Sequence, residues 1–114
     1  MFTPPDIKKY LFDAFDAAES VEQYTSGLAY SDYAADAMVQ AAVERKFEII
    51  GEALSRIRRL DSSLLDNISE HERIIGFRNV IIHGYDAIDV DIVWDAIKNH
   101  LPKLKQQIQR LLNE

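Results

Sequence analysis

The sequence predicts an all-α protein, an up-and-down bundle of four or five helices joined by short loops. The 114 residues include only four glycines and three prolines, so few positions break a helix. Apolar residues recur every three or four positions along most of the chain, as on the buried face of a helix. No segment combines the strict alternation of a strand with the turn residues of a hairpin.

Composition indicates one ordinary globular domain spanning residues 1–114. Hydrophobic residues make up 47% and charged residues 28%, and there is no cysteine, which excludes disulfides and thiolate metal sites. The net charge of −6 argues against a broad basic surface for nucleic acid, although arginines cluster locally. No apolar run has the length of a membrane span or the form of a signal peptide, so a cytoplasmic location is expected.

Two long helices are expected in the first half. The first is predicted to begin at Pro4-Pro5-Asp6, where missing amides cost little, and to end near Thr25. The second is predicted to begin at a Ser31 or Asp32 cap and to end near Arg59. Its apolar residues follow the four-three spacing of a packed seam: Val43, Phe47, Ile50, Leu54 and Ile57.

The second half predicts a short helical turn at 63–66 and two further helices. Ser69 and Glu72 match a capping box, which would open a helix ending near His83. Asp89 or Asp91 is expected to cap the last helix, which would continue through Pro102 with a kink because its seam stays in phase. That seam comprises Val90, Trp94, Ile97, Leu101, Leu104, Ile108 and Leu111.

The segment from Glu72 to Tyr85 has an unusual polar side. Glu72, Gly76, Asn79 and His83 recur at helical spacing opposite an apolar face of Ile74, Phe77 and Ile81. Glycine inside a helix costs about 1 kcal/mol, which predicts that something approaches the backbone there. Gly84 has the character of a helix C-terminal glycine, which would free Tyr85 to fold back towards the last helical turn.

Residue types alone leave several interpretations open. His83 could be a core or capping histidine, and Arg78 could be a solvated or salt-bridged arginine. The two side chains project about 140° apart on an ideal helix, so two copies of the helix across a two-fold axis would bring them together better than one. The three histidines lack metal-ligand spacing, and no phosphate-binding glycine loop or nucleophilic serine or cysteine is recognisable. Glu48 and Glu52 could serve as acid or base, but a solvated helix face explains them better.

The string Arg78-Asn79-Val-Ile-Ile-His83-Gly-Tyr85 resembles the signature of the HepT-like toxins, which belong to the HEPN domain superfamily. That signature is Arg, a polar residue, three further positions, His, one residue and Tyr. Similar strings occur at Phe47-Glu48-Ile-Ile-Gly-Glu52-Ala53, Val93-Trp94 and Leu101-Pro102-Lys-Leu104. The resemblance covers most of the chain from about Asp32 onward.

The resemblance implies a homodimeric, metal-independent endoribonuclease without a cofactor. It also implies that the protein is the toxin of a toxin–antitoxin pair, with transfer RNA as the expected class of target. Arg78 and His83 would be catalytic, with Asn79 in support. The partner would be a minimal nucleotidyltransferase antitoxin that neutralises the toxin by transferring AMP to Tyr85. The alternative from another class is a non-catalytic HEPN-type dimerisation or nucleotide-binding module.

Overall fold

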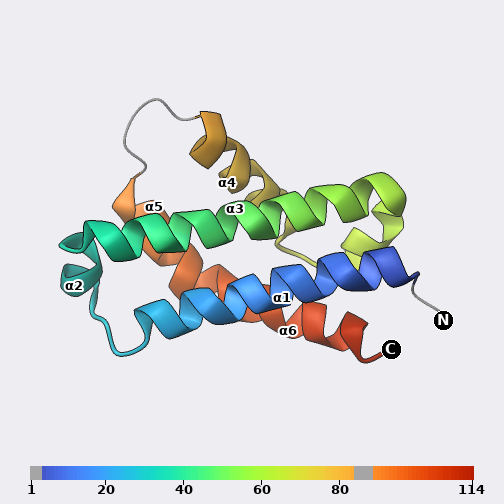
Figure 1. Ribbon diagram of the computed structural model, residues 1–114, viewed down its shortest axis with the longest axis horizontal. Helices are drawn as coiled ribbons and strands as arrows, with labels where there is room; N and C mark the ends of the chain where they lie inside the picture. The colour runs from blue at the N-terminus through green and yellow to red at the C-terminus, as the bar shows by residue number, and fades with distance from the viewer. Residues whose placement is uncertain (1–3, 84–88) are drawn as a thin grey trace.

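The computed structural model describes residues 4–83 and 89–114, and the side chains of residues 82 and 83 lie outside this description. Every regular element in these ranges is helical, which confirms the all-α class (Figure 1). The α-helices are α1 Pro5–Thr25, α2 Tyr30–Ala34, α3 Ala37–Leu60, α4 His71–His83, α5 Val90–Asp95 and α6 Leu101–Leu112. A 3₁₀-helix, Ser62–Asn67, precedes α4, and a π-helical turn, Ala96–His100, joins α5 to α6.

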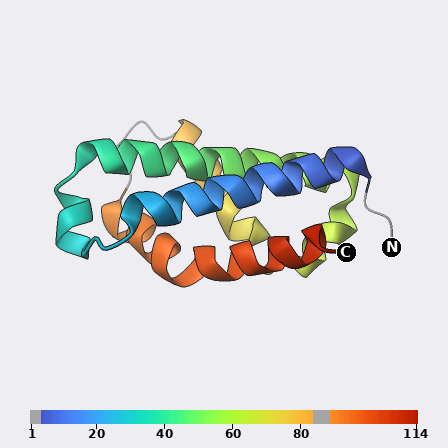
Figure 2. The ribbon, with the colours of Figure 1, turned by 60° about the horizontal axis from the view of Figure 1, so that its bottom comes forward.

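The helices form an up-and-down bundle with four main paths. α1 runs antiparallel to α3 and to α6, and the start of α1 lies at the same end of the molecule as the end of α6 (Figures 1 and 2). α4 packs on α3 and crosses it obliquely, while α5, the π turn and α6 form the fourth path (Figure 1). The short α2 adds a turn at one end. The predicted count of four or five helices therefore matches the long elements.

The core lies between α1, α3 and α6 and extends under α4. The five seam residues predicted in α3 are all fully buried. Phe47 of this seam meets Phe77 of α4 edge to face, with ring centroids 5.1 Å apart, so the pair fastens α4 to α3. No helix within the described ranges is long and apolar enough to cross a lipid bilayer.

The predicted helix from residue 31 to residue 59 is wrong at its beginning. The chain first makes the short α2 and then starts α3 at Ala37. Asp36 causes the break, since its backbone is extended and its carboxylate accepts the Val39 N–H at 3.1 Å as the cap of α3. Asp32 caps the preceding turn instead, accepting the Ala29 N–H at 2.9 Å.

The predicted capping box at Ser69 and Glu72 is also wrong. The amide and hydroxyl of Ser69 lie 2.9 and 3.3 Å from Oε1 of Gln107 on α6, and α4 begins only at His71. A tertiary contact has therefore taken the groups that a capping box would use. The described part of α4 reaches His83, and the predicted C-terminal glycine, Gly84, lies outside the described residues.

The last helical path continues through Pro102, as the seam predicted. The Leu101 N–H donates to the Ala96 carbonyl five residues back, and this π turn precedes the proline. A π turn is one of the recognised ways in which a helix bends around a missing backbone bond. Asp89 is the cap, because its carboxylate accepts the Asp91 N–H at 2.9 Å.

Candidate active site

Arg78 lies on α4 where this helix touches α3, and its guanidinium is held from two sides. Its Nη2 donates to Oε2 of Glu52 at 2.5 Å, and its Nη1 donates to Oδ1 of Asn79 at 3.1 Å. The Arg78 side chain is 24% exposed, against 60% for Arg73 on the same helix. Arg78 thus reaches solvent in a fixed orientation, which suits a group that must meet one phosphate.

The carboxylate of Glu52 is shared between two arginines. Its Oε2 accepts from Arg78, while its Oε1 accepts from Arg56, whose Nε and Nη2 each lie 3.1 Å away. The hydrogen bond from Arg56 is the largest cause that holds the pKa of Glu52 below its ordinary value, with Arg78 lowering it further and partial burial opposing both. The carboxylate therefore stays charged at every pH above this lowered pKa. The ion pair between Glu52 and Arg78, called the clamp below, is lost only as the pH falls through the lowered pKa.

Gly51 makes this contact possible because it presents no side chain towards α4. A Cβ placed there would lie 2.3 Å from Cβ and 2.8 Å from Cγ of Arg78, and 3.2 Å from the carbonyl oxygen of Ile74. The first two distances are shorter than any normal contact between carbon atoms. The bare backbone at Gly51 lets Arg78 lie directly against α3, with Glu52 as the next residue along.

The structure brings together only some of the predicted site residues. Arg78 and Asn79 are in contact, and the bond from Arg78 occupies Oδ1 of Asn79. The backbone of His83 ends α4, but its side chain lies outside the described residues, as do Gly84 and Tyr85. The roles of His83 and Tyr85 therefore stay predictions.

The polar side predicted on α4 faces solvent in the protomer. Glu72, Gly76 and Asn79 are all exposed, and a Cβ placed on Gly76 would have no atom of the described residues within 4 Å. Next to Gly76 lies a mainly apolar groove of about 200 Å³ whose wall includes Val80 and Ile92, which are 55% and 58% exposed. Nothing in the described part of the protomer requires a glycine at position 76, in contrast to position 51.

Sequence reasoning missed the role of Glu52. It placed Glu48 and Glu52 together on a solvated helix face, and for Glu48, which pairs with Arg45 at 3.3 Å, the structure agrees. Glu52 instead joins α3 to α4 across 26 positions of sequence. The available signal was Gly51, because a glycine in the middle of a helix marks a place where another backbone or side chain comes close.

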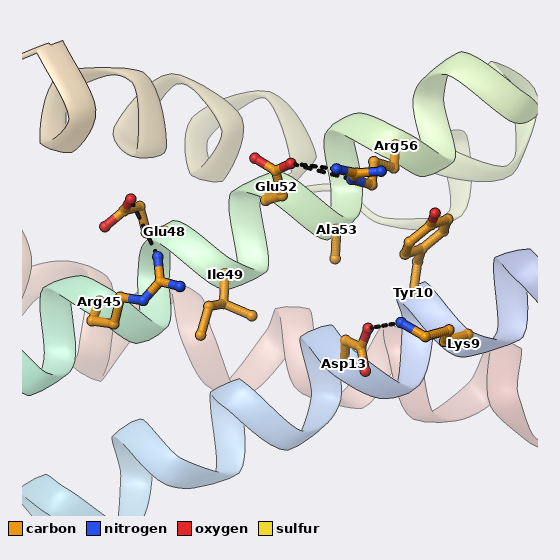
Figure 3. Close-up of a pocket in the computed structure, with 9 residues that line it drawn as sticks. All are labelled: Lys9, Tyr10, Asp13, Arg45, Glu48, Ile49, Glu52, Ala53 and Arg56. Carbon is orange, nitrogen blue, oxygen red and sulfur yellow. Dashed lines mark hydrogen bonds and ion pairs between the residues drawn. The ribbon is translucent and has the colours of Figure 1, made fainter.

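An open groove of about 500 Å³ runs between α1 and α3, and Glu52 is one of the residues that line it (Figure 3). In Figure 3 the guanidinium of Arg56 on α3 turns towards Glu52, and its carbon lies 5.8 Å from the centre of the Tyr10 ring of α1. The groove is lined by Lys9, Tyr10, Asp13, Arg45, Glu48, Ile49, Glu52, Ala53 and Arg56. Within the described residues, no group of three His, Asp or Glu side chains could hold a metal ion.

Comparisons with known proteins find one family of ribonucleases similar to this chain. The family model described as "Ribonuclease HepT-like" matches residues 14–111. A Thermococcus cleftensis protein named "Probable ribonuclease HepT" is 35% identical, over 91% of this chain and 94% of that protein. A Methanocaldococcus jannaschii protein named "Putative RNase" is 33% identical over the same shares, and a Caldanaerobacter subterraneus protein of that name is 26% identical over 94% and 95%. No solved structure matches the chain.

Gly51→Ala tests the close approach of α3 and α4. The added methyl group must push Arg78 and α4 away, at a cost of about 1–3 kcal/mol in the free energy of unfolding. Gly76→Ala is the comparison variant in the monomer, because its methyl group meets no atom of the described residues and gains up to about 1 kcal/mol of helix propensity. Urea denaturation followed by circular dichroism measures both; equal stability of the two variants would contradict the contact.

Proposed function

The chain belongs to the HepT-like ribonuclease family and is an endoribonuclease, and we propose that it cleaves RNA without a metal ion, using Arg78 and His83. The observation that supports this most is the clamp of Glu52 on Arg78. It fixes an arginine at the surface of α4, five positions before the histidine that ends the same helix. Arginine binds phosphate through parallel N–H donors, and Arg78 has more donors than the clamp uses.

RNA carries its own nucleophile, so the protein needs only acid–base groups and charge stabilisation. The 2′-oxygen attacks the adjacent phosphorus, the bond from phosphorus to the 5′-oxygen breaks, and a 2′,3′-cyclic phosphate forms. One histidine takes the proton of the 2′-hydroxyl, and another donates a proton to the leaving 5′-oxygen. Arg78 stabilises the charge that builds on the phosphate, and Asn79 orients the ring or a phosphate oxygen.

The catalytic unit in this proposal is a homodimer. Residues five apart on an ideal helix point to different sides, so one α4 alone would not bring Arg78 and His83 together, whereas two copies related by a two-fold axis would supply both groups to one groove. The exposed side of α4 at Glu72, Gly76 and Asn79 suits such a contact, because Gly76 leaves room for a second helix and Val80 adds apolar surface beside it.

In the cell, the nuclease would act as the toxin of a toxin–antitoxin pair directed at transfer RNA. Its partner would be a small nucleotidyltransferase that modifies Tyr85. The tyrosine oxygen would attack the α-phosphorus of ATP, pyrophosphate would leave, and the phenol proton would pass to solvent. The AMP group adds negative charge and bulk where the substrate phosphate must sit, so modification would exclude RNA.

The first test of this function is substitution of the proposed catalytic groups. Arg78→Ala and His83→Ala should each lower the rate of RNA cleavage by about 10²–10⁴-fold, because each removes a group that acts in the transition state. Arg110→Ala, on the exposed side of α6, should leave the rate unchanged. Gel assays on a total transfer RNA pool measure the rates. Full activity in either site variant, or activity that a chelator removes and magnesium restores, would refute the proposal.

The second test concerns assembly. Gly76→Leu should convert the dimer to a monomer, because the larger side chain occupies the space expected for the second α4, while the helical circular dichroism signal is kept. Met38→Leu, at an 83% exposed position on α3, is the control and should remain dimeric. Sedimentation velocity at micromolar concentration distinguishes the species. A wild-type protein that sediments as a monomer would exclude the shared groove.

The third test concerns Tyr85. Co-expression with the partner nucleotidyltransferase should add mass in AMP units to the wild type and not to Tyr85→Phe, as intact-protein mass spectrometry measures. Tyr85→Phe should fold normally and remain toxic in the presence of the partner. Tyr24→Phe is the control, since Tyr24 is an exposed tyrosine on α1, and it should accept the modification. AMP found on Tyr24 or Tyr33 instead would show that the motif has been misassigned.

A further inference from the structure

The clamp on Arg78 creates an electrostatic difficulty. Glu52 fixes the guanidinium, but one carboxylate and one guanidinium sum to zero charge, so the pair alone would offer a phosphate little attraction. The carboxylate would also compete with the phosphate for the same N–H donors. The positioning of Arg78 and its positive charge are therefore in conflict unless something offsets Glu52.

Arg56 supplies that offset. It lies one helical turn after Glu52 on α3, and its Nε and Nη2 both engage Oε1, the carboxylate oxygen that Arg78 does not use. The group of Arg56, Glu52 and Arg78 carries a net charge of +1. Because Arg56 draws on the opposite side of the carboxylate, Glu52 can orient Arg78 without cancelling its charge.

Tyr10 helps to keep Arg56 in this place. Its ring comes from α1, across the groove, and the guanidinium carbon of Arg56 lies 5.8 Å from the ring centre (Figure 3). Contacts of this type favour a cation over the aromatic face. The first helix of the chain thereby reaches the active site through Arg56 and Glu52.

We propose that Arg56 is a positioning residue for RNA cleavage, which offsets the charge of Glu52 so that Arg78 is held and yet remains attractive to phosphate. This inference rests on the proposed function of Arg78. An ordinary surface ion pair between Arg56 and Glu52, spaced four residues apart on a helix, would contribute little to stability and nothing to the reaction. Because Arg56 is 49% exposed, its replacement leaves the fold intact and isolates the effect of its charge.

The experiment is a double-mutant cycle on RNA cleavage with Arg56→Gln and Glu52→Gln. Arg56→Gln should lower kcat/KM about tenfold, through a higher KM, in the protein that retains Glu52. In the Glu52→Gln background, the same change should have no further effect, because there is no carboxylate left to offset. Arg56→Lys should keep most of the activity, and Arg59→Gln, at an exposed position in the last turn of α3, should behave as the wild type.

Three results would overturn the inference. The first is an unchanged kcat/KM in Arg56→Gln, and the second is a loss of kcat/KM in Arg56→Lys as large as in Arg56→Gln. The third is a loss of kcat/KM that persists in the Glu52→Gln background, because it would mean that Arg56 contacts RNA directly. A readout independent of cleavage separates this from failure of the proposed function. In ¹³C NMR titration of the Glu52 carboxyl, Arg56→Gln should raise its pKa towards the ordinary value and Arg59→Gln should not. An unchanged pKa refutes the inference by itself, whereas an inactive wild type refutes the proposed function.

Discussion

The site depends on the close approach of α3 and α4 at Gly51. Because position 51 has no side chain, Cβ and Cγ of Arg78 occupy the space that a side chain there would fill. The next residue, Glu52, accepts a hydrogen bond from the guanidinium of Arg78. The edge-to-face contact between Phe47 and Phe77 holds the same two helices together nearby. A larger residue at position 51 would separate α3 from α4 and break the contact between Glu52 and Arg78. The packing of the two helices and the position of Arg78 therefore both require a residue without a side chain at position 51.

The bundle could be predicted from the sequence because burial imposes a period of three and four on every long helix. The α3 seam from Val43 to Ile57 is fully buried, and the last seam keeps its phase through Pro102. The errors lie at helix starts. Asp32 and Asp36 can both cap, and local sequence does not say that both do; Ser69 resembles a cap, but a distant glutamine on α6 binds it. Such choices are decided by tertiary contacts, which a local pattern does not contain.

Only part of the candidate site could be predicted from the sequence, because a local pattern does not contain tertiary contacts. Arg78, Asn79, His83 and Tyr85 form a local string, and its resemblance to the HepT-like signature made them candidates. Glu52 lies 26 positions away, and its spacing from Arg56 is that of any ion pair on a solvated helix. What distinguishes it is the folded contact with Arg78. The net charge of −6 does not describe the local charge of the folded protein. At the surface of α3 and α4, two arginines surround one carboxylate.

The central claim is that an arginine held by Glu52 and a histidine at the end of α4 suffice to break RNA with the 2′-hydroxyl as nucleophile. Analysis of the RNA ends produced by the purified protein in the presence of a chelator tests this most directly. The account predicts fragments that end in a 2′,3′-cyclic phosphate, paired with fragments that begin with a 5′-hydroxyl. Fragments with a 3′-hydroxyl and a 5′-phosphate would show that water is the nucleophile and would contradict it.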